Sequence, residues 1–332
     1  MTGDGGTPEL PRHVIGDQAE LGIDGLTEVS VIGSGGSSTV YQARQDDLDR
    51  TVAVKVVHAA WSMETRARFE HEREVTGRLS GHLAIVPIFA TGITTRGEPY
   101  LLMPFYGRGS LFRLMQDRGP LPWREATFML ETLAQTLADS HREGIVHRDV
   151  KPGNVMLTSH LQPRLSDFGI TQPTGVAISG GAIAYTPSYS PPEAFEAGTA
   201  DPTVDVYGLG ATLWAMLAGR APFTDPGEPI DMDQVMVRAR MGGLPPPPKD
   251  TPGPVAGLIE RAMSLNPADR PADAGAFAAE LRRAVRLSHP GPAAADRADR
   301  RRQDLLPVAA LAGMITAGIL LIAFGVGRLL FG

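Results

Sequence analysis

Hydrophobic and polar positions in the first third of the chain form short runs that predict β-strands. From Thr27 to Val57 the runs VSVIG, TVYQAR and TVAVKVV are rich in β-branched residues and are separated by Gly or Asp, as in strands joined by turns. A charged amphipathic pattern predicts a helix over Met63 to Leu79, and strands return over Val86 to Met103. Residues 1–25, rich in Gly, Pro and acidic residues, predict a disordered leader.

Beyond Gly109 the pattern predicts mainly helices. The helix predicted over Trp123 to Glu143 carries its apolar positions at roughly helical spacing, at Phe128, Leu130, Leu133, Leu137 and His141. Asp205 to Ala218 is apolar almost throughout, which predicts a helix buried on every side. Further helices are predicted over Met232 to Arg240, Val255 to Leu265 and Ala274 to Leu287. A small β-rich lobe therefore precedes a larger helical lobe, an α+β architecture.

The C-terminal part of the chain has a different character. Residues 287–304 form a polar linker, and Leu305 to Gly327 carries no charged residue and is long enough to span a bilayer. A buried core helix is the alternative, but the polar linker offers such a helix no partner. Positive charge before the span, at Arg297 and Arg300 to Arg302, predicts that the N-terminal side is cytoplasmic and that residues 328–332 lie across the plasma membrane.

Small residues recur within this predicted span. Ala309, Gly313 and Ala317 repeat every fourth residue, a spacing that suits a homodimer of closely packed helices. The alternative is chance, because Ala and Gly are abundant in the whole chain.

The amino-acid composition excludes several kinds of site and partner. The chain of 332 residues has a net charge of −6 and no cysteine, so it predicts no nucleic-acid partner, no disulfide framework and no thiol nucleophile. Its only lysines are Lys55, Lys151 and Lys249. Lysine and arginine are not interchangeable in a tight site, and two of the three lysines lie within motifs. Lys249 follows four prolines and is expected to be a solvated loop charge.

A glycine-rich turn between two predicted strands suggests phosphate binding. In IGSGGSSTV, Gly33 and Gly35 would let backbone amides approach phosphate oxygens that a Cβ would keep away. By itself the segment is equally compatible with an ordinary hairpin turn. Lys55 lies in the middle of the strand VAVKVV, where a charge needs a partner; Glu72 in the next helix is the natural one.

The motifs HRDVKPGN (His147 to Asn154) and SDFG (Ser166 to Gly169) carry the most specific signal. With them the sequence resembles the bacterial Hanks-type Ser/Thr protein kinases over residues 26–286. The resemblance implies the two-lobed protein kinase fold, with lobes over 26–104 and 107–286. It also implies ATP and Mg²⁺ or Mn²⁺ as cofactors, protein substrates with Ser or Thr, and autophosphorylation in membrane signalling.

The resemblance further implies the site residues. Asp149 matches the catalytic base, and Asn154 and Asp167 match the metal ligands, with oxygen donors that suit Mg²⁺. The remaining catalytic residues would be Lys55, Glu72, Lys151 and Thr186. The hinge would offer adenine the carbonyl of Pro104 and the amide of Tyr106. The nucleotide-binding set would be completed by Ile32, Gly33, Ser34, Gly35, Val40, Ala53 and Lys55.

Structural partners follow from the same family pattern. Glu193, in the segment TPSYSPPE, is expected to form a buried ion pair with Arg270, and Asp205 is expected to accept hydrogen bonds from the catalytic-loop backbone. The chain departs from the pattern at Ser38, Pro104, Tyr185 and Gly208, none of which removes a catalytic group. Five other histidines show no metal-ligand spacing and are expected at the surface or in packing: His58, His71, His82, His141 and His160.

Two alternatives to an active protein kinase stay open. A pseudokinase scaffold would bind nucleotide without transferring phosphate, but such proteins lose part of a catalytic set that is complete here. A small-molecule kinase of related fold is disfavoured by the peptide-binding segment TPSYSPPE. Lys151, two residues after Asp149, favours Ser/Thr over Tyr substrates within the family.

Overall fold

The computed structural model describes residues 21–35, 38–58, 70, 73–75, 77–79, 81–168, 188–195, 201–225, 232–241 and 243–289. Two units divide the chain, residues 1–284 and 285–332, and the fold and site described below belong to the first. Glu72, Thr186, most of the leader and linker, and the apolar segment Leu305 to Gly327 lie outside the described residues. Within the described residues no helix is both long and apolar enough to cross a bilayer.

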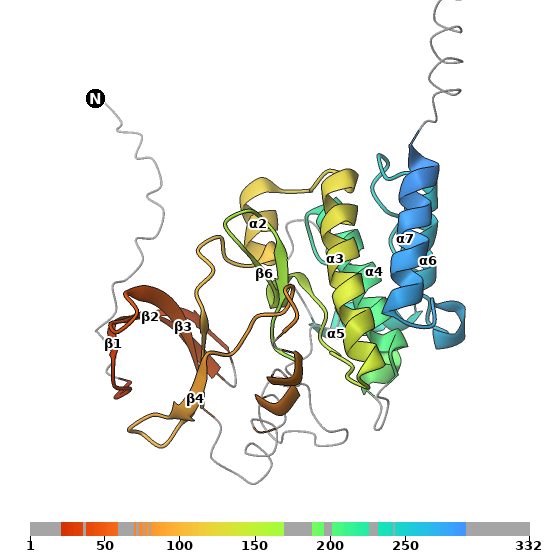
Figure 1. Cartoon of the computed structure of the whole chain (residues 1–332). Coiled ribbons are helices and arrows are strands. Elements are labelled where there is room, and N and C mark those ends of the chain that lie inside the picture. The colour runs from red at the N-terminus through yellow and green to blue at the C-terminus, as the bar shows by residue number, and fades with distance from the viewer. Residues whose placement is uncertain are drawn as a thin grey trace, which may run out of the picture. The chain divides into compact units, whose positions relative to one another are not determined.

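A five-stranded antiparallel sheet forms the first lobe (Figure 1). Its strands, in the spatial order β1-β2-β3-β5-β4, are β1 (Leu26–Ser34), β2 (Ser38–Gln45), β3 (Arg50–Val57), β4 (Ala90–Ile93) and β5 (Pro99–Pro104). The first three strands contain the predicted runs and extend up to three residues beyond them, and β4 and β5 lie in the predicted strand region or end one residue past it. The described residues of the helix predicted before β4, at 70, 73–75 and 77–79, are helical.

The alternation of side chains along β3 separates the core of this lobe from its functional face. Val52, Val54 and Val56 are buried in one hydrophobic cluster, which includes Tyr41 and Leu102. Because successive side chains of a strand point to opposite faces, Lys55 lies on the face away from this cluster. The sheet thus directs a buried lysine toward the second lobe.

Helices dominate the second lobe (Figure 1). They are α2 (Leu111–Arg118), α3 (Trp123–Arg142), α4 (Thr203–Ala218), α5 (Met232–Met241), α6 (Gly253–Ala262) and α7 (Ala274–Ser288), with 3₁₀ turns at Pro152–Asn154, Pro192–Phe195 and Pro267–Asp269. A two-stranded ribbon of β6 (Val155–Leu157) and β7 (Pro163–Leu165) lies among them. The segment at residues 84–86 pairs with β7: Leu165 donates to the carbonyl of Ala84 (2.8 Å) and accepts from Val86 (2.9 Å).

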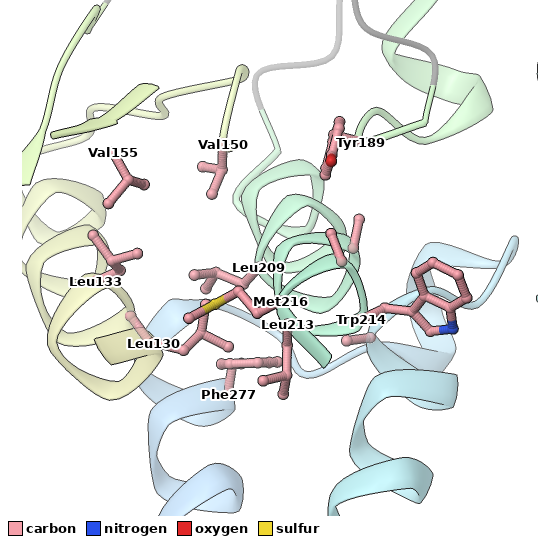
Figure 2. Packing of buried hydrophobic residues seen from close by; sticks show 14 of the residues in the cluster. Leu130, Leu133, Val150, Val155, Tyr189, Leu209, Leu213, Trp214, Met216 and Phe277 are labelled. Carbon is pink, nitrogen blue, oxygen red and sulfur yellow. The ribbon is translucent and has the colours of Figure 1, made fainter. Parts of the chain in front are cut away.

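Helix α4 is the centre of this lobe, as its apolar sequence predicts. Every residue from Thr203 to Leu217 is buried. Figure 2 shows Leu209 and Met216 of α4 facing Leu130 of α3 and Phe277 of α7. The helix ends where Gly219 adopts φ 70° and donates its backbone N–H to the Ala215 carbonyl, a left-handed conformation that glycine adopts without a Cβ penalty.

The predicted pattern of α3 needs a correction at one position. Leu130, Leu133 and Leu137 are fully buried, as expected, but the side chain of Phe128 is 62% exposed. Thr127 takes a buried place beside it, because its hydroxyl donates to the Trp123 carbonyl at 2.8 Å and so needs no other partner. A threonine whose hydroxyl bonds to a backbone carbonyl of its own helix can therefore be buried, even where the apolar pattern predicts that the next residue is the buried one.

Candidate active site

The catalytic loop lies between α3 and β6 in the chain, and its backbone forms hydrogen bonds with Asp205 of α4. The carboxylate of Asp205 accepts the backbone N–H of His147 (2.8 Å) and that of Arg148 (2.6 Å). Arg148 has φ 68°, a left-handed conformation that is costly for a side-chain-bearing residue unless its surroundings enforce it. The two hydrogen bonds supply that enforcement and confirm the predicted role of Asp205.

His141 belongs to the same network, which the sequence analysis did not predict. Its Nδ1 accepts the N–H of Ala274 at 3.4 Å, so Nε2 carries the proton and donates to Asp205 at 2.9 Å. The His141 side chain is only 5% exposed. The histidine thus connects the start of α7 to the carboxylate that holds the catalytic loop. Helical spacing placed His141 on the apolar face of the helix but did not indicate its partners, because they are far away in sequence.

Gly208 is a second residue whose importance appears only in the fold. A Cβ at this position of α4 would lie 2.8 Å from Cβ of Val150 and 2.9 Å from its carbonyl oxygen. From the sequence it is a departure from the family pattern that removes no catalytic group. In the structure it lets the catalytic loop approach α4 more closely than any side chain would allow.

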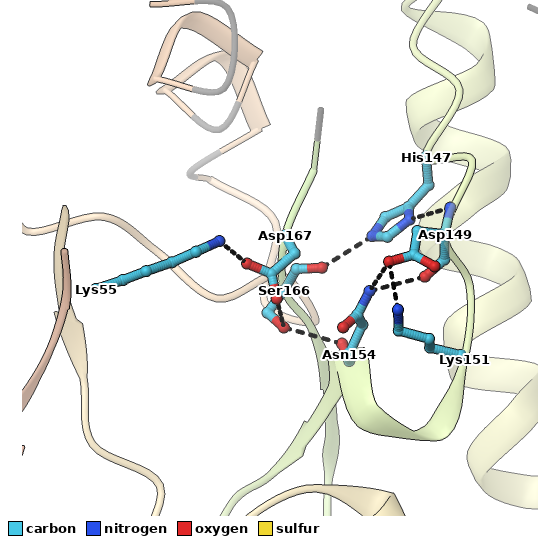
Figure 3. A network of polar contacts seen from close by, with 7 residues as sticks. All are labelled: Lys55, His147, Asp149, Lys151, Asn154, Ser166 and Asp167. Carbon is cyan, nitrogen blue, oxygen red and sulfur yellow. Dashed lines mark hydrogen bonds and ion pairs between the residues drawn. The ribbon is translucent and has the colours of Figure 1, made fainter. Parts of the chain in front are cut away.

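Asp149 lies at the centre of a polar cluster, shown in Figure 3. Asn154 donates its Nδ2 to the Asp149 carboxylate at 2.8 Å and to the Asp149 carbonyl at 2.9 Å. Lys151 places its ammonium 2.8 Å from the same carboxylate. Burial raises the pKa of Asp149 above its ordinary value, and the charge of Lys151 opposes that rise. The result is a desolvated carboxylate beside a cation, a suitable arrangement for accepting a proton.

Asp167 lies opposite, at the end of β7, and pairs with Lys55 of β3 (Figure 3). Burial alone would raise the pKa of Asp167, but the Lys55 ammonium, together with His147 and Ser166, holds this pKa below the ordinary value. Asp167 has φ 65°. The contact joins two residues 112 positions apart, so it brings the two lobes together at the site.

His147 connects the two halves of the cluster. Its Nδ1 accepts the backbone N–H of Asp149 at 3.2 Å, so its Nε2 carries the proton and donates to the Ser166 carbonyl at 2.9 Å. The ring also packs edge-on against Phe168, with centroids 4.6 Å apart. The sequence analysis quoted His147 within its motif without assigning it this role.

The donor atoms of Asn154 and Asp167 fit a hard divalent cation. Asn154 uses its amide nitrogen toward Asp149, so the oxygen Oδ1 is the atom that it would offer a metal. Asp167 adds a carboxylate ionised at neutral pH. Among the described residues no group of three or more His, Cys, Asp or Glu side chains forms a metal site. Two oxygen donors suit Mg²⁺ that takes its other ligands from phosphate and water.

The sheet register brings the predicted nucleotide-binding residues Gly33, Val40 and Lys55 into one cross-strand row, with Ala53 two residues away from Lys55 on β3. Gly33 pairs with Val40 and Val40 with Lys55, while Ala53 pairs with the residue before Pro104. A Cβ at Gly33 or Gly35 would meet no atom of the chain closer than 4.0 or 3.8 Å, respectively. Packing therefore does not demand these glycines, and the open space beside them suits the approach of a ligand.

The remaining predicted nucleotide-binding residues lie near the ends of β1 and β5. Ile32 and Ser34 are exposed near the end of β1. Tyr106 follows β5 in the chain, and burial raises the pKa of its hydroxyl, with Arg164 opposing the rise. The backbone carbonyl of Tyr106 accepts from Gly109 at 2.8 Å.

The predicted pair of Glu193 and Arg270 is confirmed. The Arg270 side chain is fully buried and binds the Glu193 carboxylate with both terminal nitrogens, one of them at 3.2 Å. It also donates to the carbonyls of Ser264 (2.8 Å) and Thr203 (3.2 Å). A bidentate pair with further hydrogen bonds is a geometry in which a buried charge is tolerated.

Comparisons with known proteins agree with this geometry. Residues 26–282 match the model of the protein kinase domain family. The chain is 41% identical over 280 residues to the serine/threonine-protein kinase PknK of Mycobacterium tuberculosis, covering 83% of this chain and 24% of PknK. It is 35% identical to the serine/threonine-protein kinase PknL of the same organism, covering 75% of this chain and 63% of PknL.

A solved structure extends the comparison to three dimensions. The kinase domain of Mycobacterium tuberculosis PknI is similar with a TM-score of 0.58 and 27% identity, covering 80% of this chain and 98% of that one. The present chain spans about a quarter of the length of PknK, so the comparison with PknK concerns its kinase domain. The chain therefore belongs to the protein kinase family, and these relatives of it are serine/threonine-protein kinases.

Proposed function

We propose that the chain transfers the γ-phosphate of ATP to Ser and Thr hydroxyls of protein substrates, with Asp149 as the base that orients the hydroxyl and accepts its proton. The observation that carries the proposal is the cluster around Asp149. Asn154 and Lys151 contact its carboxylate at 2.8 Å each, and burial raises its pKa. Phosphoryl transfer depends on positioning and charge neutralisation, and this cluster provides both.

Each further residue has a role that its contacts support. Lys151 would neutralise the transferring phosphoryl group while keeping Asp149 ionised. Lys55, now paired with Asp167, would hold the α- and β-phosphates together with Glu72. Asn154 and Asp167 would hold Mg²⁺ or Mn²⁺, which neutralises phosphate charge when bound. Thr186 would bridge Asp149 and Lys151, but Thr186 and Glu72 lie outside the described residues.

The test is direct. Purified full-length chain with labelled ATP and Mg²⁺ should phosphorylate itself or a general protein substrate on Ser or Thr. Binding of nucleotide without any transfer would favour the pseudokinase alternative. Mapping of the product sites would then identify the residues that accept phosphate.

We also propose that autophosphorylation occurs in the segment between Gly169 and Thr186, with Thr174 and Ser179 as the first candidates and Thr171 next. The support is the position of Arg148, directly before the base Asp149. Its backbone N–H donates to the Asp205 carboxylate at 2.6 Å. An arginine held there can bind a phosphate on a neighbouring segment. Phosphate found only outside residues 170–186 of active protein would contradict this proposal.

We propose, finally, that Leu305 to Gly327 anchors the kinase domain to the cytoplasmic face of the plasma membrane. The support is its uncharged length and the arginines before it. Membrane fractionation with a C-terminal tag tests the topology, and protease access to that tag from the cytoplasmic side would contradict it.

A homodimer through Gly313 would raise the effective concentration of one kinase for its partner; unchanged autophosphorylation in membranes after Gly313→Leu would exclude it.

A further inference from the structure

A row of polar side chains links three segments of the first lobe beside the glycine-rich turn. Nε2 of His58, the residue after β3, lies 2.7 Å from Oγ1 of Thr39 on β2. Nδ1 of the same ring lies 2.9 Å from the carboxylate of Glu98, the residue before β5. A single imidazole therefore connects β2 with the β4–β5 turn.

Glu98 is the fixed end of this row, because the β4–β5 turn holds its backbone. The Thr94 N–H donates to the Glu98 carbonyl at 2.8 Å, and the Glu98 N–H donates to the Thr94 hydroxyl at 3.2 Å. Thr94 itself is buried, with only 4% of its surface exposed. The backbone that carries the Glu98 carboxylate is therefore fixed by two hydrogen bonds within the turn.

The direction of the hydrogen bonds follows from the chemistry of the groups. An ionised carboxylate only accepts, so Nδ1 of His58 donates to Glu98. In the neutral ring Nε2 is then an acceptor, and the Thr39 hydroxyl donates to it. The Oγ of Ser34 lies 3.5 Å from the same hydroxyl. Thr39 is thereby held from one side by a ring that Glu98 orients.

Thr39 occupies a critical place in the register of the sheet. It pairs with Ser34 across the β1–β2 hairpin, so these two residues flank the glycine-rich turn. The next residue, Val40, pairs with both Gly33 and Lys55. A shift of Thr39 would therefore move the backbone amides beside the phosphate site together with the row that ends at Lys55.

We propose that His58 is a positioning residue for phosphate recognition, because its ring connects β2, the strand after the glycine-rich turn, to Glu98 in the β4–β5 turn. The proposal rests on the proposed function only in that ATP is the ligand. Exposed ion pairs by themselves contribute little, and His58 and Glu98 are 37% and 29% exposed. The contribution comes instead from the bond to Thr39, which is 8% exposed and cannot exchange that partner freely for water.

Binding measurements separate this role from a general effect on folding. The full-length chain is titrated with the non-hydrolysable β,γ-imido analogue of ATP in the presence of Mg²⁺, and separately with adenosine, which has no phosphates. We expect His58→Ala to weaken binding of the analogue about three- to tenfold, the range of one hydrogen bond, and to leave adenosine binding unchanged. Thr39→Val should have the same effect, and adding it to His58→Ala should cause no further loss.

Two variants serve as controls. His58→Gln can donate to Glu98 and accept from Thr39 through one amide, so it should restore the affinity for the analogue. His160→Ala removes an exposed histidine outside this row and should change neither ligand. Unchanged binding of the analogue in His58→Ala would overturn the proposal, as would an equal loss for both ligands. If the chain binds the analogue but never transfers phosphate, the proposed function fails while this comparison can still be made.

Discussion

His141 on α3 donates its Nε2–H to the carboxylate of Asp205 on α4 across 2.9 Å, in the interior of the helical lobe. The same carboxylate accepts two backbone N–H groups of the catalytic loop. Two hydrogen bonds therefore connect the buried His141 side chain to the backbone of Arg148, the residue directly before the base Asp149. This relationship leads to the first prediction.

His141→Phe should destabilise the protein by about 1–3 kcal/mol and lower the phosphotransfer rate. The ring shape is retained, but a buried carboxylate loses a donor, which carries a desolvation cost of that size. His141→Gln keeps an N–H near the Nε2 position and should recover much of both losses. Urea unfolding and initial rates check the two effects; a Phe variant with wild-type stability and rate would contradict the role of His141.

Asp149→Asn and Lys55→Met should each lower phosphotransfer by at least about 100-fold while the fold persists. The first variant removes the proton acceptor, an effect typically of 10²–10⁴ in rate. The second leaves Asp167 and the phosphates without their cation. Asp117→Asn, at an exposed carboxylate on α2, is the matched control and should keep full activity. Near wild-type turnover in either of the first two variants would contradict the assigned chemistry.

The acid limb of the rate profile should depend on Lys151. Asp149 must be ionised to accept a proton, so the rate falls as pH falls through its pKa. The cation of Lys151 lowers this pKa, against the larger rise caused by burial. Lys151→Met should therefore raise the pKa and move the acid limb of kcat to higher pH, while Lys151→Arg should leave it near the wild-type position. The measurement is kcat against pH; an acid limb that stays in place in the Met variant would contradict this cause.

Glu193→Gln should destabilise the protein by about 3–5 kcal/mol, because it leaves the buried Arg270 charge uncompensated. Arg282→Met is the exposed control: its pair with Glu131 spans 3.4 Å with both side chains about 40% exposed, so its loss should stay below about 1 kcal/mol. Urea unfolding of both variants measures the difference. Equal losses would show that burial does not govern the strength of the Glu193 pair.

Gly208→Ser should lower both stability, by about 1–3 kcal/mol, and the rate, because the new Cβ displaces Val150 and with it the loop that carries Asp149. Gly257→Ala, on α6, is the matched control. No atom lies within 4 Å of a Cβ there, and alanine in a helix interior should stabilise by about 0.5–1 kcal/mol. A wild-type rate in the Gly208→Ser variant would mean that Val150 can shift without moving Asp149.

Features that depend on local order could be predicted from the residues alone. Alternation of β-branched residues located the strands around Lys55, and the apolar run from Asp205 to Ala218 located the central helix. The motifs HRDVKPGN and SDFG, through their resemblance to the protein kinase family, indicated Asp149, Asn154 and Asp167 as candidate site residues. The family pattern added the Glu193–Arg270 pair and the role of Asp205, both of which the structure contains.

The contacts between residues far apart in sequence became visible in the folded chain alone. His141 meets Asp205, Gly208 meets Val150, and His58 meets Thr39 and Glu98. Each contact involves a residue type that is common at surfaces or in turns, so neither hydrophobic period nor composition marks it. Burial within one helix also departs from the apolar pattern: Thr127 is buried and Phe128 exposed. The pattern of hydrophobic residues indicates which secondary structure a segment prefers. The partner of a side chain depends instead on how all the segments around it pack together.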